Sequence, residues 1–519
     1  MSNQTITFLV LAAVIVVFVL DRLPVAVVAV GTALTLWATG VLDLNQALAG
    51  FGDPAVLFIA SLFVVSESLD ASGITAWAGQ ELVTRVGDSR TRLLVLMMLA
   101  VAGLTALISV NGAVAALLPV MVVTAARLGR PTSQLLMPLA FAAHAGSLLA
   151  LTGSPVNVVA SEYSHDAGAG SFGYFSFAVA GIPLLLGTMA VVLLFGDRLL
   201  PHRSVRSLSK DFSDHARTLV EQYSLADGES VLTRTTGLAE VVIPPRSELV
   251  GDTAFPGMVT ESGDLVVVAV QRHEQDVAGE TVLAVGDTLL LQGTWGALDE
   301  RLDDPGVLVV DDPQVVRRQA VPLGSGAKRA LVILAAMVLL LATGAVPPAV
   351  AGLLAAGALI VSGVLSIDSA YRGISWTTVV LVAGMIPLST AMTETGAAAR
   401  LADELVRVVG DAGPYALLLG LFVLTTVLGQ LISNMATALI VFPIALSAAR
   451  DLDVSARPAL MCVTVSAAAA LLTPVATPAN LMVMEPGGYR FGDYWKLGLP
   501  LLVLYGVVAV LLVPVFWRP

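Results

Sequence analysis

Two long apolar stretches of this chain share their landmarks at a single spacing of 323 residues, as Asn111 and Asn434 illustrate. The same spacing joins Pro24 with Pro347, Gly40-Val41-Leu42 with Gly363-Val364-Leu365, Gly50 with Gly373, Gly73 with Gly396, and Ser154-Pro155-Val156-Asn157 with Thr477-Pro478-Ala479-Asn480. Chance does not keep one spacing over so many positions. Matching interruptions by Gly, Pro and Asn indicate a site between two membrane repeats, near the bilayer midplane.

The composition is that of an integral membrane protein. The chain is 56% hydrophobic and 13% charged, with a mean hydropathy of +0.87, whereas soluble domains carry about 25% charged residues. Apolar runs of membrane-spanning length recur from Ile6 to Phe516. We therefore expect an all-α, multi-pass protein of the inner (plasma) membrane. The sequence has no basic stripe that would indicate a nucleic-acid partner and no catalytic cluster that would indicate an enzyme. With a single cysteine, Cys462, it cannot form a disulfide framework.

The apolar runs in each repeat predict about five transmembrane helices and one broken stretch. The expected crossings lie near residues 5–20, 24–40, 54–71, 134–163 and 175–199, and near 329–344, 347–363, 374–391, 458–484 and 497–516. Edge helices are expected at about 74–89 and 395–409. The broken stretches, 91–127 and 413–449, are interrupted at Ser109-Val110-Asn111-Gly112 and Ser433-Asn434-Met435.

A broken stretch is either two crossings joined by a tight turn or a re-entrant hairpin. With hairpins, the two repeats have opposite orientations in the membrane. If the N-terminus is outside, the cytoplasmic face then collects seventeen Lys and Arg residues, four of which (Arg206, Lys210, Arg317 and Arg318) lie at the edges of the central soluble segment. The outer face keeps five: Arg400, Arg407, Arg450, Arg457 and Arg518. Because this asymmetry obeys the positive-inside rule, we favour inverted repeats.

Residues 204–327 form a cytoplasmic insertion between membrane repeats 1–203 and 328–519. Apolar and polar residues alternate there, which predicts strands at 239–245, 265–271 and 288–292. Its core, about 225–310, resembles a TrkA-C domain, the C-terminal domain of potassium-conductance regulators, through Leu238–Pro245, Ser247–Gly251, Gly263–Val270 and Val285–Gly293. The resemblance implies a small α/β unit that dimerises and in some relatives binds a nucleotide. The alternative is a dimerisation module without a ligand.

The polar motifs inside apolar sequence carry the chemistry. A helix break exposes carbonyl oxygens that can hold a small cation and N–H groups that attract anions. Asn and Ser add neutral oxygens and donors at Ser109–Gly112 and Ser433–Met435. Proline opens the fourth crossing of each repeat at Ser154–Asn157 and Thr477–Asn480, because it lacks an amide donor. His144 has no counterpart, since its repeat partner is Ala467, and we expect it to pack or to form hydrogen bonds.

At these motifs the chain resembles the divalent anion:sodium symporter family. Ser433-Asn434 with Ala436-Thr437-Ala438 is similar to the family's Ser-Asn-Thr signature, and Gly153-Ser154-Pro155-Val156-Asn157 to its Gly-Thr-Pro-Pro-Asn. The resemblance implies a homodimer that moves its substrate by an elevator mechanism, with sodium at Asn111, Gly153, Asn434 and Ala476. The candidate substrate-binding residues are Ser109, Asn111, Gly112, Ser154, Asn157, Ser433, Asn434, Thr437, Thr477 and Asn480.

The chain departs from that family at two hydroxyls. Gly112 and Met435 stand where the family has threonine after each asparagine, and Val110 replaces the expected Ser or Asn. The anion is therefore left open between sulfate, a dicarboxylate and another oxyanion. A cation/proton antiporter or arsenite-type exporter would need a membrane carboxylate, for which Glu67 and Asp70 are candidates. A gated channel or sensor controlled by the insertion is a third alternative.

Overall fold

The computed structural model describes residues 2–20, 22–75, 77, 78, 81, 89–128, 130–203, 236–260, 263–272, 275–277, 279–294, 297, 298, 307–310, 326–409, 413–474 and 476–517. The chain divides into two compact units. One contains residues 1–69, 78–207 and 328–519. The other contains residues 70–77 and 208–327. Each is described by itself.

The larger unit is helical. Its first half contains α1 (Asn3–Leu20), α2 (Val25–Ala38), α3 (Leu44–Leu48), η1 (Ala49–Gly52), α4 (Pro54–Ala71), α6 (Arg90–Leu107), α7 (Val110–Arg127), η2 (Thr132–Gln134), α8 (Leu136–Gly146), η3 (Leu151–Gly153), α9 (Pro155–Asp166) and α10 (Ala178–Leu199). The predicted edge helix at 74–89 falls mostly outside the described residues.

The second half follows the same plan. It contains α14 (Ala327–Thr343), α15 (Pro348–Val361), α16 (Ile367–Gly373), α17 (Trp376–Glu394), α18 (Ala397–Val409), α19 (Pro414–Leu431), α20 (Asn434–Asp451), α21 (Ala456–Ala468), α22 (Pro478–Met484), η5 (Phe491–Asp493), α23 (Tyr494–Val507), a π-helical turn η6 (Val508–Leu512) and α24 (Val513–Phe516). Helices α2 and α15 begin 323 residues apart, and so do α9 and α22.

The helices have the length and apolarity that a bilayer requires. Among the described residues, seven helical segments are long and apolar enough to cross a membrane, and shorter apolar helices such as Val25–Ala38 and Pro348–Val361 accompany them. The prediction of a helical, multi-pass membrane protein is confirmed.

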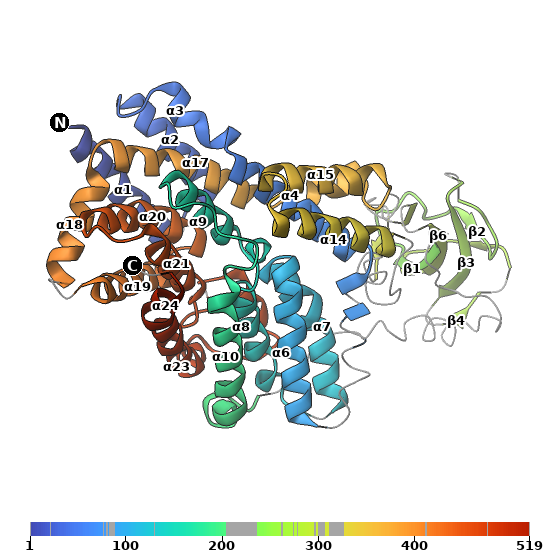
Figure 1. The fold of residues 1–519 in the computed structure, drawn as a ribbon. Helices are drawn as coiled ribbons and strands as arrows, with labels where there is room; N and C mark the ends of the chain where they lie inside the picture. The colour runs from blue at the N-terminus through green and yellow to red at the C-terminus, as the bar shows by residue number, and fades with distance from the viewer. Residues whose placement is uncertain are drawn as a thin grey trace. The chain divides into compact units, whose positions relative to one another are not determined.

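Small residues let two of these helices approach closely. Helices α2 and α17 lie side by side (Figure 1). A Cβ atom at Gly384 of α17 would lie 2.7 Å from the carbonyl carbon of Ala29 in α2. Backbone contact of this kind is how helices associate where lipid removes the hydrophobic driving force between them.

Hydrogen bonds join segments far apart in sequence at several places in the helical unit, among them one near Gln4 and one at Arg203. In one place Gln4 Nε2 donates to the Gly396 carbonyl at 3.1 Å, and Gln46 Nε2 donates to Glu394 at 2.8 Å. In the other, the Arg203 guanidinium donates to the Asp493 carboxylate at 2.6 Å. Both sets of contacts connect the first repeat with the second.

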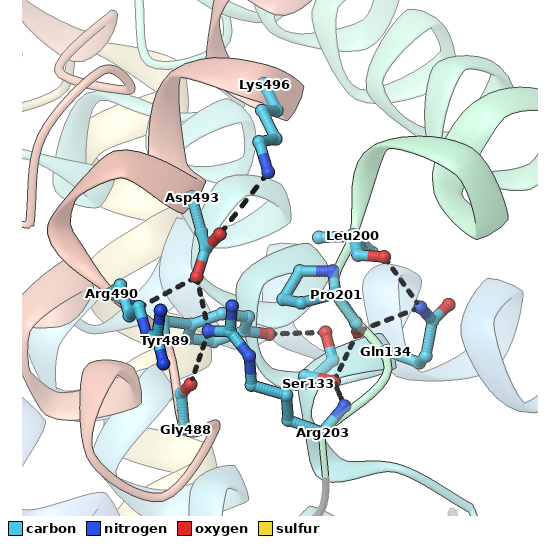
Figure 2. A network of polar contacts seen from close by, with 10 residues as sticks. All are labelled: Ser133, Gln134, Leu200, Pro201, Arg203, Gly488, Tyr489, Arg490, Asp493 and Lys496. Carbon is cyan, nitrogen blue, oxygen red and sulfur yellow. Dashed lines mark hydrogen bonds and ion pairs between the residues drawn. The ribbon is translucent and has the colours of Figure 1, made fainter.

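The contact at Arg203 belongs to a larger polar network (Figure 2). Arg203 also donates to the Gly488 carbonyl, and its backbone N–H donates to Ser133 Oγ in η2. The Tyr489 hydroxyl donates to the Ser133 carbonyl at 2.6 Å. The network therefore fixes the segment that leaves α10 against both η2 and the loop before α23.

The smaller unit is built on an antiparallel sheet. Its described strands are β1 (Thr236–Val242), β2 (Thr253–Ala254), β3 (Leu265–Arg272), β4 (Gln275–Asp276), β5 (Thr281–Val282), β6 (Thr288–Thr294) and β7 (Leu308–Val309), in the orders β4-β3-β6-β1-β7 and β2-β5. The three strands predicted from alternation correspond to β1, β3 and β6. Their inward side chains, among them Val241, Leu265 and Leu291, form the core of this unit.

Candidate transport site

Both broken stretches contain a true helix break, capped by serine. Helix α6 ends at Leu107 and α7 begins at Val110, while α19 ends at Leu431 and α20 begins at Asn434. Ser109 Oγ accepts the Gly112 N–H at 3.2 Å, and Ser433 Oγ accepts the Ala436 N–H at 3.3 Å. Each serine thus satisfies an amide that a helix start leaves unpaired.

The two asparagines that follow the breaks have side-chain oxygens available for a ligand. Asn111 is exposed at the start of α7. Asn434 is half-buried at the start of α20, and its Oδ1 atom is buried without a hydrogen-bond partner in the described part of the chain. Thr437 Oγ1, one turn further along α20, is also buried without a hydrogen-bond partner among the described residues. A helix start also carries partial positive charge, which attracts anions.

Asn157 and Asn480 have a different environment, because both are fully buried. The Asn157 side-chain amide donates to the carbonyls of Ser147 at 2.7 Å and Ala150 at 2.9 Å. Asn480 donates in the same way to Ala470 at 2.8 Å and Thr473 at 3.1 Å. Their nitrogen atoms therefore hold the unwound loops after α8 and α21, and only their oxygens are left for another partner.

The prediction that His144 forms hydrogen bonds is confirmed. Its ring lies buried in α8, with Nε2 at 3.2 Å from Asn480 Oδ1 and 3.2 Å from Thr477 Oγ1. Thr477 caps α22 by accepting the Asn480 N–H at 3.3 Å. Ser154, its counterpart in the first repeat, accepts the Val156 N–H at the start of α9. A side chain of the first repeat therefore contacts the second repeat's motif.

Two further residues hold the loops: Thr152, which belongs to the interrupted fourth crossing, and Gln430, which the sequence motifs do not include. Gln430 of α19 donates to the Ala469 carbonyl at 3.2 Å and accepts the Leu472 N–H at 3.1 Å. In the first repeat, the Thr152 hydroxyl lies 2.7 Å from the Ala106 carbonyl at the end of α6. A lone amide in an apolar run, three residues before Ser433, was a signal that could have identified Gln430.

Two of the four candidate sodium positions, Gly153 and Ala476, lie in these loops. A Cβ atom at Gly153 would lie 2.5 Å from the Ser147 carbonyl oxygen, so the loop requires glycine there. Ala476, its repeat partner, is buried, and Thr473 Oγ1 beside it is buried without a partner among the described residues. The described residues contain no cluster of three His, Cys, Asp or Glu that could hold a metal. The available donors are neutral oxygens, which suit a sodium ion.

Helix packing pairs elements of one repeat with elements of the other. Helix α7 of the first repeat packs against α22 of the second, and α20 of the second packs against α9 of the first. Helices α8 and α22 are also in contact. The second helix of each broken stretch therefore packs against the helix that follows the interruption in the other repeat. Glu67 and Asp70 lie apart from these motifs in sequence, half-buried near the end of α4.

Comparisons with known proteins agree with a transport role. The profile of the CitMHS citrate transporter family matches residues 15–448 and 392–518. The chain is 31% identical to the uncharacterized transporter YfbS of Escherichia coli, over 98% of both chains. It is 27% identical to sodium/sulfate cotransporter 1 of Chlamydomonas reinhardtii, over 54% of this chain and 33% of that protein.

A solved structure agrees at the level of the fold. The YdaH transporter of Alcanivorax borkumensis matches with a TM-score of 0.51 at 14% identity, covering 91% of this chain and 88% of that one. The family profile covers most of the chain, and the relative from Escherichia coli is similar along its whole length. The chain is a membrane transporter that belongs to the CitMHS citrate transporter family.

Proposed function

We propose that the chain is a secondary active transporter of a small oxyanion, with sulfate the first candidate and sodium the coupling ion. The observation that carries the proposal is the start of α20, where Asn434 Oδ1 and Thr437 Oγ1 are buried without a partner among the described residues. A buried polar group left unpaired destabilises a protein by roughly 1–3 kcal/mol. A bound ion that pairs with these atoms removes that penalty.

Sodium and the anion use different atoms of one region. We assign sodium to Asn111 with Gly153 in one repeat and to Asn434 with Ala476 in the other, where carbonyl and amide oxygens are the donors. The anion lies between the two helix starts, near Ser109, Ser433 and Thr477. The relatives from Chlamydomonas reinhardtii, described as sodium/sulfate cotransporters, support sodium as the coupling ion.

Sulfate is preferred over a dicarboxylate because of two missing hydroxyls. Gly112 and Met435 occupy the positions after the two asparagines, and neither side chain can donate a hydrogen bond to a second carboxylate. A compact tetrahedral anion has one charged group, so its hydrogen-bond donors need to surround a single position. The serine caps and helix starts supply them there.

The repeats are proposed to be inverted in the membrane. Gly396 of the second repeat corresponds to Gly73 of the first. Three predicted crossings, α1, α2 and α4, lie between the start of the chain and Gly73. The hydrogen bond from Gln4 to Gly396, with that from Gln46 to Glu394, supports one common face for these segments. Gly73 falls on the opposite face if α1, α2 and α4 each cross once. Equivalent positions then lie on opposite sides, as inverted repeats require.

The remaining parts of the proposal concern assembly. Alternating access takes place by an elevator movement of the transport elements in a homodimer of the inner (plasma) membrane. Residues 204–327 form the cytoplasmic insertion, with a TrkA-C-like core at about 225–310 that regulates transport or stabilises the dimer. A nucleotide is the ligand to test there.

Uptake by proteoliposomes tests the proposal directly. Purified protein is reconstituted, and labelled sulfate and succinate are supplied with an inward sodium gradient, with equal potassium instead, or with a proton gradient alone. We expect sulfate uptake that depends on sodium. Uptake of neither anion, together with sodium-driven proton movement, would establish a cation/proton antiporter instead, and arsenite export would be tested in the same vesicles.

A further inference from the structure

The side chain of His144 forms an unusual contact, because it lies in the first repeat and hydrogen-bonds a motif of the second. Its Nε2 atom is 3.2 Å from both Asn480 Oδ1 and Thr477 Oγ1, and all three residues are buried. The chemistry of the three groups determines which atom donates in each bond.

The orientation of the Asn480 amide is fixed by its other contacts. The carbonyls of Ala470 and Thr473 can accept hydrogen bonds but cannot donate them, so the atom facing both must be the amide nitrogen. The amide oxygen therefore faces His144. Because that oxygen only accepts, His144 Nε2 must carry a hydrogen and donate it.

The donor role of His144 in turn decides the role of the Thr477 hydroxyl. A hydroxyl has two acceptor lone pairs and one hydrogen. One lone pair accepts the Asn480 N–H at 3.3 Å, and the other faces Nε2–H, which is shared between two oxygens. Nε2 has no free lone pair to accept the hydroxyl hydrogen. That hydrogen must therefore be donated to a third group.

The equivalent motif of the first repeat, Ser154–Asn157, lacks a histidine partner from the second repeat. Ala467 occupies the position equivalent to His144, and Asn157 Oδ1 is buried without a partner in the described part of the chain. Ser154, the equivalent of Thr477, accepts a backbone N–H, and Ala467 has no imidazole to offer it. One of the two interrupted crossings thus has an oriented hydroxyl donor, and the other has a free acceptor oxygen.

We propose that His144 is a positioning residue that directs the Thr477 hydroxyl hydrogen toward the transported anion. The inference rests on the proposed function, because an anion is the acceptor that it supplies. Loss of His144 leaves Thr477 free to donate elsewhere, so anion affinity falls while the transport cycle itself remains intact.

Kinetics of sulfate uptake in proteoliposomes test this role. Matched variants are His144→Leu, His144→Gln, which keeps an N–H donor, Thr477→Val and the double variant His144→Leu/Thr477→Val. Thr464→Val is the control, because the buried Thr464 hydroxyl donates at 2.8 Å to Leu460 in its own helix. The amount of folded transporter in each sample is measured, so that KM is separated from the maximum rate.

We expect His144→Leu and Thr477→Val each to raise KM roughly ten-fold, with the double variant no worse than either alone. His144→Gln should restore a KM near that of the native protein, and Thr464→Val should not change it. A native KM in His144→Leu, or multiplied effects in the double variant, would overturn the role of His144 alone. Absence of anion uptake by the native protein would overturn the transport proposal itself.

Discussion

Asn157 and Asn480 make the same pair of hydrogen bonds at equivalent positions of the two repeats. Each side-chain amide donates to the carbonyls ten and seven residues before it. Those carbonyls belong to loops that have left the helix and lie away from water. In such surroundings an unpaired carbonyl destabilises the fold, so the two amides permit the helices to open at the site.

We expect Asn157→Leu and Asn480→Leu to destabilise the folded protein by about 2 kcal/mol, because each removes two hydrogen bonds to carbonyls of the unwound loops. The chain's single cysteine, Cys462, is buried, so its labelling by a thiol-reactive dye during heating reports unfolding. Labelling should begin at a lower temperature in both variants. Asn111→Leu is the control, since Asn111 is exposed, and an equal shift there would contradict the structural role assigned to the amides.

Asn111→Ala and Asn434→Ala should abolish transport while leaving the fold intact. Asn111 is exposed, and the Asn434 oxygen has no partner among the described residues, so truncation breaks few contacts within the protein. Sodium-driven uptake is measured alongside Cys462 labelling. Thr425→Val is the matched control, because the Thr425 hydroxyl donates to Leu421 in its own helix. Native uptake rates in both alanine variants would remove these asparagines from the mechanism.

The sequence predicted the helix breaks but not the division of work within the motifs. Spacing and apolarity placed the interruptions near Ser109 and Ser433, because serine and asparagine in apolar sequence are informative by themselves. The same residue type then has two roles: Asn157 uses its amide nitrogen to hold a loop, whereas Asn434 begins a helix and its oxygen has no hydrogen-bond partner among the described residues. Only the three-dimensional path of the loop distinguishes them. Gln430 and His144 contact segments distant in sequence, so their hydrogen-bond partners depended on packing that no local pattern records.

Gly153→Ala should reduce both stability and transport, whereas Ala476→Gly should be tolerated. The added Cβ at Gly153 would lie 2.5 Å from a backbone oxygen, so the loop that adjoins the proposed sodium position must move. Ala476 is the equivalent residue and already accommodates a methyl group. Uptake at a series of sodium concentrations tests this difference. A native sodium dependence in Gly153→Ala would show that the loop is not part of the ion site.

Gly112→Thr should shift preference from sulfate toward succinate, because it restores a hydroxyl beside Asn111. A Cβ at Gly112 would lie 3.3 Å from Ser109 Oγ, so the serine side chain must yield slightly. Gly112→Val, of nearly equal shape but without the hydroxyl, is the control. The ratio of succinate to sulfate uptake is measured in both variants. The hypothesis is wrong if valine and threonine change that ratio equally.

Removal of residues 225–310 should leave the KM for the anion and the choice of substrate unchanged, while regulation or dimer stability changes. The reason lies at Arg203, just before the insertion. Its guanidinium contacts Asp493 and Gly488, its backbone contacts Ser133, and the Asp493 side chain is 5% exposed. These bonds anchor the end of α10 independently of the sheet that follows. Uptake kinetics and the oligomeric state in detergent are compared for the deletion and for Arg203→Ala in the full chain. Arg203→Ala should lower thermal stability, because it leaves a largely buried carboxylate with weaker partners. A changed substrate profile in the deletion would mean that the insertion takes part in recognition, and the proposed division of labour would fail.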